Sequence, residues 1–93
     1  MGTFHTNPHA LHGMTVVVET QGSKVYVGRC EDVDDERVLL LDAGAHEEGT
    51  GGRTKQDYVQ QAARFGVWAT VDVVAIPRQD IVTLKRLADI ETG

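Results

Sequence analysis

The densest group of chemically active side chains in this sequence is the acidic run Glu31–Glu36, EDVDDE, in which five of six residues are carboxylic acids. Its composition predicts a tight turn between two strands, with Arg37 directly after it. Exposed neighbouring acids of this kind have no reason for the raised pKa that a general acid needs. In one chain the run is a solvated hairpin tip, whereas around an assembly axis it would form a ring of carboxylates that repels phosphate and attracts cations.

Three histidines near the N-terminus form the second group. His5, His9 and His12 are spaced by four and three residues, so on one helix they would share a face that could hold a metal. However, the helix start signal Asn7-Pro8 comes after His5, and no carboxylate or cysteine lies nearby in the sequence. We therefore predict exposed histidines, with neither a metal site nor a cofactor.

No pattern in the sequence indicates a catalytic centre. It contains no nucleophile–base pair and no cofactor fingerprint, and the run GTGG at 49–52 lacks the Gly-Lys-Ser/Thr ending of a phosphate-binding loop. The single Cys30 cannot form a disulfide within the chain and is predicted to be a small buried hydrophobe in a strand. We expect a protein that is not an enzyme.

The composition is typical of a globular protein, with 41% apolar and 25% charged residues and a net charge of −5. The negative net charge argues against non-specific binding to nucleic-acid phosphates, which needs clustered lysine and arginine. No apolar run approaches the ~20 residues of a membrane span, and the N-terminus lacks the basic-then-apolar pattern of a signal peptide. Because a lone cysteine also suggests a reducing compartment, we expect a cytoplasmic protein without a membrane partner.

The elements that must position these groups are predicted to form a single domain over residues 1–93. We expect a disordered start over 1–6, and then a short helix from Asn7-Pro8 that ends at Gly13. A loop and a short helix are expected as an insertion over 44–66.

The inserted helix is expected to span 54–65. Thr54 and Asp57 have the spacing of a capping box, and Gly66 is a natural end. Strands are expected over 14–20, 24–32, 37–42, 67–76 and 80–87.

These strands indicate a mainly β fold, a small and strongly bent five-stranded barrel of the SH3-like type. Gly28 lies inside the second strand, where glycine often marks a bend or a close approach of two backbones. Small barrels need such a bend, because one long strand must curve through both halves.

The stretch from Val67 to Leu87 predicts that this chain self-associates. Its two strands meet at a joint around Pro77, and both are apolar on both faces; alternation places Ile81 on one face and Val82 and Leu84 on the other. Such strands need cover on both faces, and a chain this short has little material to supply it. We therefore expect another copy to cover them, with these candidate interface residues: Val71, Val73, Val74, Ile76, Ile81, Val82 and Leu84. Trp68 heads the first of the two strands, and we expect it either at one end of the barrel or in an interface.

The order and spacing of these parts resemble the Sm and Sm-like (LSm) proteins, from the first strand through the last. The residues that carry the resemblance are Asn7-Pro8, Val16-Val17-Val18, Gln21-Gly22, Gly28, Asp34, Leu39, Leu41, Asp42-Ala43 and the run Ile76–Leu84. The resemblance implies a homo-oligomeric ring, usually of six or seven subunits, with five also compatible. In such rings the fourth strand of one subunit pairs with the fifth strand of the next. This agrees with the two strands between Val67 and Leu87, which are apolar on both faces.

The resemblance also implies a site for single-stranded RNA in the turn before the third strand. RNA-binding relatives place there an acid, a ring that stacks on the base and an asparagine. In this chain Asp34 matches the acid, and the stacking position falls at Glu36, which has no ring. The asparagine position falls at Val38, or at Arg37 if the turn shifts by one residue.

The second half of the implied RNA site lies at the joint, where relatives have Arg-Gly. This chain has Pro77 at the arginine position and Arg78 at the glycine position. The candidate RNA-binding residues are therefore Asp34, Glu36, Arg37 and Arg78, in a non-standard or weak pocket. The alternative is a ring scaffold for protein partners with no RNA binding, which the acidic turn and the net charge favour.

Overall fold

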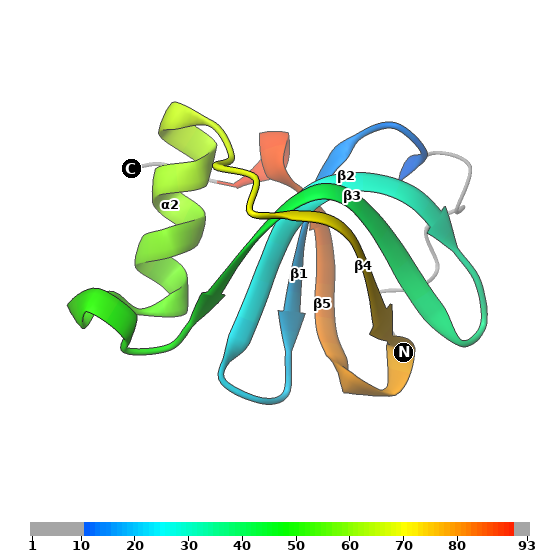
Figure 1. Cartoon of the computed structure of the whole chain (residues 1–93), viewed down its shortest axis with the longest axis horizontal. Helices are drawn as coiled ribbons and strands as arrows, with labels where there is room; N and C mark the ends of the chain where they lie inside the picture. Colours follow the sequence, from blue (N-terminus) through cyan, green and yellow to red (C-terminus); the bar gives the residue numbers. More distant parts are fainter. Residues whose placement is uncertain (1–10, 91–93) are drawn as a thin grey trace.

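The computed structural model describes residues 11–90 and shows one antiparallel sheet of five strands with a helix inserted before the fourth strand (Figure 1). The elements are β1 (Thr15–Thr20), β2 (Lys24–Val33), β3 (Arg37–Glu47), the 3-10 turn η2 (Thr50–Gly52), α2 (Lys55–Phe65), β4 (Val71–Pro77), the 3-10 turn η3 (Arg78–Asp80), β5 (Ile81–Arg86) and the 3-10 turn η4 (Leu87–Asp89). The prediction of a mainly β fold with five bent strands and one inserted helix is confirmed.

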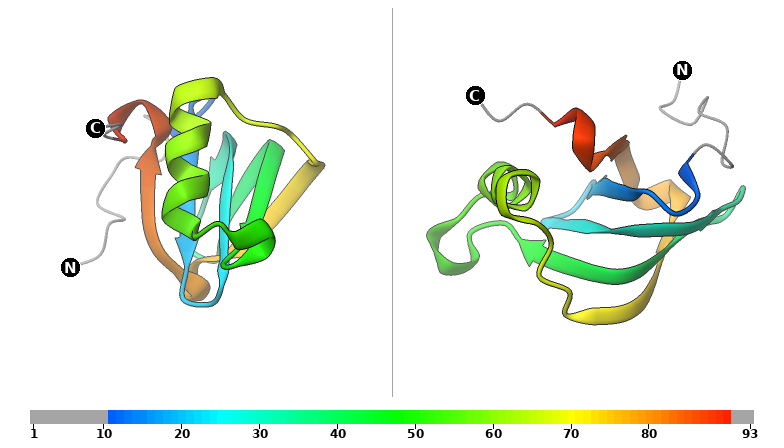
Figure 2. Two further views of the ribbon diagram at one scale, coloured as in Figure 1. Left: turned by 90° about the vertical axis from the view of Figure 1, so that its left-hand side faces the viewer. Right: turned by 90° about the horizontal axis from the view of Figure 1, so that it is seen from above.

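The strand order is β4-β3-β2-β1-β5, so β4 and β5 lie at the two edges of the sheet. Within the described residues β4 pairs only with β3, and β5 pairs only with β1. Within residues 11–90 the strands bend strongly and no ladder joins β4 to β5, so this part of the chain forms an open, bent sheet and the closure of the predicted barrel is not seen (Figure 2). In the same described part, the outer edges of β4 and β5 lie unpaired on opposite sides of the sheet.

The bend of the sheet is located at Gly28 of β2, as the sequence predicted. A Cβ atom at this position would lie 2.7 Å from the Cβ and 2.9 Å from the Cα of Ala43 on β3. The β2–β3 register shifts between Val27 and Arg29, and Asp42 has a φ of +48° beside this shift. Because the two backbones approach so closely, only glycine fits here.

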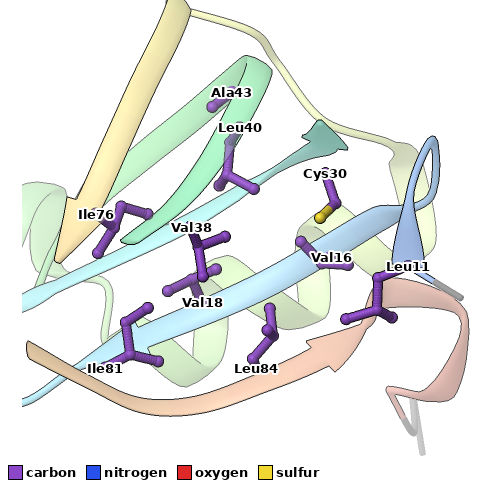
Figure 3. Close-up of a cluster of buried hydrophobic side chains, with 10 residues drawn as sticks. All are labelled: Leu11, Val16, Val18, Cys30, Val38, Leu40, Ala43, Ile76, Ile81 and Leu84. Carbon is purple, nitrogen blue, oxygen red and sulfur yellow. The ribbon is translucent and has the colours of Figure 1, made fainter. Parts of the chain in front are cut away.

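The hydrophobic core lies inside the bend (Figure 3). Its buried members come from the segment before β1 and from all five strands: Leu11, Val16, Val18, Cys30, Val38, Leu40, Ala43, Ile76, Ile81 and Leu84. Cys30 is fully buried here, which confirms its prediction as a small buried hydrophobe. Burial raises the pKa of its thiol, and the nearby carboxylates of Asp32 and Glu31 raise it further.

Helix α2 covers the opposite face of β1 and β2. A second buried cluster joins Val17, Val25 and Val27 of these strands to Val59 and Ala62 of the helix. The chain therefore supplies its own second cover for β1 and β2. On the edge strands, by contrast, the side chains of Val73 and Val82 remain 56% and 51% exposed.

The capping box at the start of α2 is present as the sequence predicted. The hydroxyl of Thr54 accepts a hydrogen bond from the amide of Asp57 at 3.0 Å, and the Asp57 carboxylate accepts one from the amide of Thr54 at 3.1 Å. The helix ends at Gly66, where φ is +93°. Both ends of the inserted helix are thus fixed by local sequence.

Replacing Thr54 by alanine should lower the free energy of unfolding by about 1 kcal/mol, because the helix loses the acceptor for the Asp57 amide. Urea unfolding followed by circular dichroism measures the change. Thr50→Ala, a threonine in the preceding turn that does not cap the helix, is the control and should change little. Equal losses in the two variants would contradict a specific role for the cap.

Two strand boundaries differ from the sequence prediction. β3 continues five residues beyond Asp42, because His46 and its neighbours still pair with the start of β2. β4 begins at Val71 instead of residue 67, because residues 67–70 cross from the end of α2 to the edge of the sheet (Figure 2).

Some predictions concern residues outside the described range. The predicted disordered start, His5, His9 and most of the predicted N-terminal helix lie there. Within the described range, Leu11 is buried, and Gly13, the predicted end of that helix, has a φ of +81°, the left-handed conformation that suits glycine. Among residues 11–90 no helix is long and apolar enough to cross a membrane.

Candidate functional site

The acidic turn between β2 and β3 is a tightly hydrogen-bonded loop. Asp34 organises it: its carboxylate Oδ1 accepts hydrogen bonds from the amides of Glu36 and Arg37, both at 2.8 Å, and its own amide donates to the carbonyl of Arg37 at 3.0 Å. These two amide donors lower the pKa of the Asp34 carboxyl, and the guanidinium groups of Arg37 and Arg78 lower it further. Asp34 is thus a structural anion of the turn.

The joint between β4 and β5 packs against this turn. The backbone amide of Arg78 donates to the carbonyl of Glu36 at 2.9 Å, and its guanidinium Nη1 donates to the carbonyl of Asp34 at 2.9 Å. The same Nη1 lies 3.7 Å from the carboxylate of Asp35. The structure therefore brings together all four candidate RNA-binding residues, although Asp34 and Arg78 are 44 residues apart in the sequence.

The charges at this site largely offset each other. Arg78, whose side chain is only 23% exposed, is held by the turn itself, and Arg37 lies 3.9 Å from the carboxylate of Asp34. Asp34 thus faces Arg37 and Asp35 faces Arg78, and Glu36 adds a third carboxylate to the same turn. Where the resemblance predicts a ring that stacks on a base, the turn has Glu36, which offers a carboxylate instead. The site can hold a loop in place, but it presents few groups that attract a phosphate or stack on a base.

Acidification should reveal the role of Asp34. The pKa of the Asp34 carboxyl is lower in the folded chain than its usual value of 3.8. The ionised carboxylate therefore stabilises the fold fully above pH 3.8, and this stabilisation is lost as the pH falls through the lowered pKa of the folded chain. We expect Asp34→Asn to be less stable than the native protein near neutral pH, and the difference to shrink between about pH 5 and pH 2. Urea unfolding across this range tests it. Asp32→Asn, a carboxylate on β2 outside the turn, is the control; a constant difference for Asp34→Asn would contradict the assignment.

The candidate interface residues fall into three groups. Ile76, Ile81 and Leu84 are buried in the core of the chain itself, so their side chains are not available to a neighbour. Val71 and Val74 are half-buried, and Val74 packs against the same core. Val73 and Val82 are exposed and remain the side chains that an edge contact could cover.

A bulge in β5 explains the difference from the expected alternation. The β1–β5 register shifts between Glu19 and Thr20, so Thr83 pairs with Glu19 but Ile81 pairs with Thr20. Val82 is the extra residue and lies outside the regular pairing. Ile81 and Leu84 therefore both face the core, where strict alternation had placed them on opposite faces.

Sequence reasoning missed one buried polar pair. His46 is buried at the end of β3; its ring stacks on Tyr58 of α2 with centroids 5.0 Å apart, and its Nε2 lies 2.9 Å from the carbonyl of Arg53. Burial raises the pKa of the Tyr58 hydroxyl. The pair joins α2 to the sheet. No local sequence pattern predicts it, because His46 and Tyr58 come from separate elements. Within residues 11–90 no three His, Cys, Asp or Glu side chains form a cluster that could hold a metal.

Comparison with solved structures identifies the fold. The Sm protein of Pyrococcus abyssi, solved in complex with a uridine heptamer, superposes with a TM-score of 0.58 at 16% identity, covering 84% of this chain and 89% of that one. The chain has the Sm fold. A chain of the NatC complex bound to CoA matches with a TM-score of 0.57 at 19% identity, covering 84% of this chain and 80% of that one.

A further match to the Sm fold is a chain of the NatC complex bound to Gag peptide and CoA, with a TM-score of 0.56 at 19% identity. It covers 83% of this chain and 86% of that one. No family model and no curated protein matches the sequence. The resemblance drawn from the sequence is thus confirmed for the fold.

Proposed function

We propose that this protein is a non-catalytic assembly subunit that joins copies of itself head to tail into a ring through the edges of β4 and β5. The observation that carries this proposal is the pair of strand edges, at opposite sides of one bent sheet, that no other strand among residues 11–90 pairs with. Unpaired amides and carbonyls along a strand edge are a template for another strand. Contacts between two different surfaces of the same chain generate rings when the rotation closes.

The ligand of the ring is proposed to be protein, with RNA as the second candidate. Arg78 is tied to the carbonyl of Asp34 and lies near the carboxylate of Asp35, and the chain carries a net charge of −5. Both features weaken the attraction for phosphate. The matched structures support both classes of ligand, since the Sm protein is in complex with a uridine heptamer and the other matched chains belong to the NatC complex. The convergence of Arg37 and Arg78 at one turn is what favours RNA.

Light scattering on the purified protein tests the ring. We expect a particle of six or seven times the chain mass of 10.1 kDa, with five times also compatible with the edge contact. A monomer at micromolar concentration would overturn the proposal. The same measurement at rising salt should leave the particle intact, because main-chain hydrogen bonds and apolar contacts carry the seam.

Filter binding with oligo-U and oligo-A at low and moderate salt separates the two ligand classes. Our proposal expects no binding beyond a weak background. Tight, salt-sensitive binding that falls on Arg78→Ala would instead establish the RNA function. Arg64→Ala on α2, which lies outside the acidic turn and its joint, is the matched control for the loss of one positive charge.

A further inference from the structure

The most exposed large apolar side chain among residues 11–90 is Trp68, at 83%. It lies three residues before β4, on the segment that carries the chain from α2 to the sheet edge (Figure 2). It is also the single tryptophan of the sequence. Exposure alone does not mark an interface, since Phe65 is 82% exposed as well. What distinguishes Trp68 is its place at the start of a strand edge, where a strand from a neighbouring copy would cover it.

An apolar hollow lies at the end of the other edge strand. Its volume is about 460 Å³, and it is bounded by Met14 before β1, Ala63 of α2, and Leu87 and Ala88 directly after β5. Thr15 and Arg86 complete its lining. Met14 is 41% exposed, so the hollow is open to a neighbour.

The segment that carries Trp68 and the apolar hollow at the end of β5 lie at the same end of the molecule. β4 runs from the end of α2 toward the joint η3, and β5 runs back from that joint toward η4 (Figure 1). In a ring whose axis runs roughly along these strands, the β4 edge of one copy meets the β5 edge of the next copy. Rotation about that axis does not reverse a strand, so the two strands still run in opposite directions. The two strands then pair antiparallel, and the start of β4 meets the end of the neighbouring β5.

Matching the faces of the two strands limits the registers that this seam can adopt. One of them places Val74 opposite Leu84 of the next copy, since both side chains pack on the core side of their strands. Asp72 then lies opposite Arg86 of the next copy, and Val71 lies opposite its Leu87. The β4 edge carries Asp72 where the β5 edge carries Lys85 and Arg86, so the signs of the charges are complementary. The guanidinium of Arg86 already holds the carboxylate of Asp89 in its own chain, with Nε 2.8 Å from Oδ2, so Lys85 supplies the unshared part of this complementarity.

We propose that Trp68 of one subunit packs into the hollow formed by Met14, Ala63, Leu87 and Ala88 of the next subunit. The inference rests on the proposed ring and specifies its main side-chain contact. Edge-to-edge hydrogen bonds align the two strands but are similar for any sequence. The buried indole supplies the apolar area and fixes the register, as aromatic anchors do at other interfaces.

Fluorescence of the single tryptophan tests the contact directly. Diluting the native protein through its dissociation range should shift the Trp68 emission to longer wavelength as the ring separates, because the indole passes from the hollow into water. Light scattering on the same samples reports the assembly itself. A ring whose emission is identical to that of the dissociated chain would overturn the inference and leave the ring standing.

Two variants and a control extend the test. Trp68→Ala should weaken subunit association roughly thirtyfold, which corresponds to about 2 kcal/mol. Ala88→Glu, at an exposed position of the free chain, should weaken it similarly and shift the Trp68 emission of any remaining ring to longer wavelength. Phe65→Ala removes an equally exposed ring, 82% exposed, that does not line the hollow, and it should change neither readout.

The outcomes separate the inference from the proposed function. A native protein that is monomeric throughout overturns the ring and the contact together. A ring that Trp68→Ala and Ala88→Glu leave unchanged overturns only the contact. Circular dichroism of each variant checks the fold, which we expect to be retained because both substituted side chains are exposed in the single chain.

Discussion

Gly28→Ala is expected to lower the free energy of unfolding by about 2–3 kcal/mol, although it adds a single methyl group. That methyl would lie 2.7 Å from the Cβ of Ala43, 2.9 Å from its Cα and 3.2 Å from the carbonyl oxygen of Leu41. Two of these three atoms belong to the backbone of β3, so no side-chain rotation can relieve the contact. The strands must separate at the point where the sheet bends, and the core beneath them loosens.

Chemical denaturation of Gly28→Ala and of a matched glycine variant measures this loss. Gly22→Ala lies in the turn between β1 and β2, where an added Cβ meets no atom within 4 Å, and it should change stability little. If Gly28→Ala proved as stable as Gly22→Ala, the close approach of β2 and β3 would be wrong. Ala43→Gly in the Gly28→Ala background should recover part of the loss, because it removes the nearer of the clashing atoms.

Val82→Asp is expected to dissociate the proposed ring, raising the dissociation constant between subunits at least a hundredfold (about 2.7 kcal/mol). Val82 is the bulged residue of the free β5 edge and is 51% exposed in the single chain. In the seam it would lie against the β4 edge of the next subunit, where a carboxylate loses its water without gaining a partner. Sedimentation or light scattering over a dilution series measures the change.

The stability of the Val82→Asp monomer distinguishes an edge contact from damage to the fold. Because the side chain is exposed, unfolding of the separated chain should change by less than about 0.5 kcal/mol. A charge at Val74, which packs against the core, should instead destabilise the monomer itself. Ala45→Asp, on an exposed position of the inner strand β3, is the control and should leave the ring intact. An unaffected ring in Val82→Asp would place the seam elsewhere.

Much of the fold could be predicted because its signals are local. The capping box of Thr54 and Asp57, the helix end at Gly66 and the bend glycine Gly28 act through their own backbone and nearest neighbours. Each was found in the structure at its expected place. The limits of β3 and β4 could not be predicted as well, because they depend on how far a partner strand extends.

The predicted contact residues at the strand edges were harder to assign. Alternation along 81–84 placed Ile81 and Leu84 on opposite faces, but the bulge at Val82 turns both toward the core. A bulge is set by the register of two strands, and β1 and β5 are separated by most of the chain. The sequence of β5 alone carries no signal for it.

The sequence by itself determined the five strands, the inserted helix, the acidic turn and the Sm-like order of parts, because each depends on short-range backbone preferences and apolar periodicity. Only the tertiary structure decided what these parts do together. It tied Arg78 to the turn of Asp34, buried three of the expected interface residues in the chain's own core, and left two strand edges, Trp68 and an apolar hollow exposed. The physical reason is that burial and pairing are properties of contacts between distant segments, and these contacts exist only once the sheet has bent.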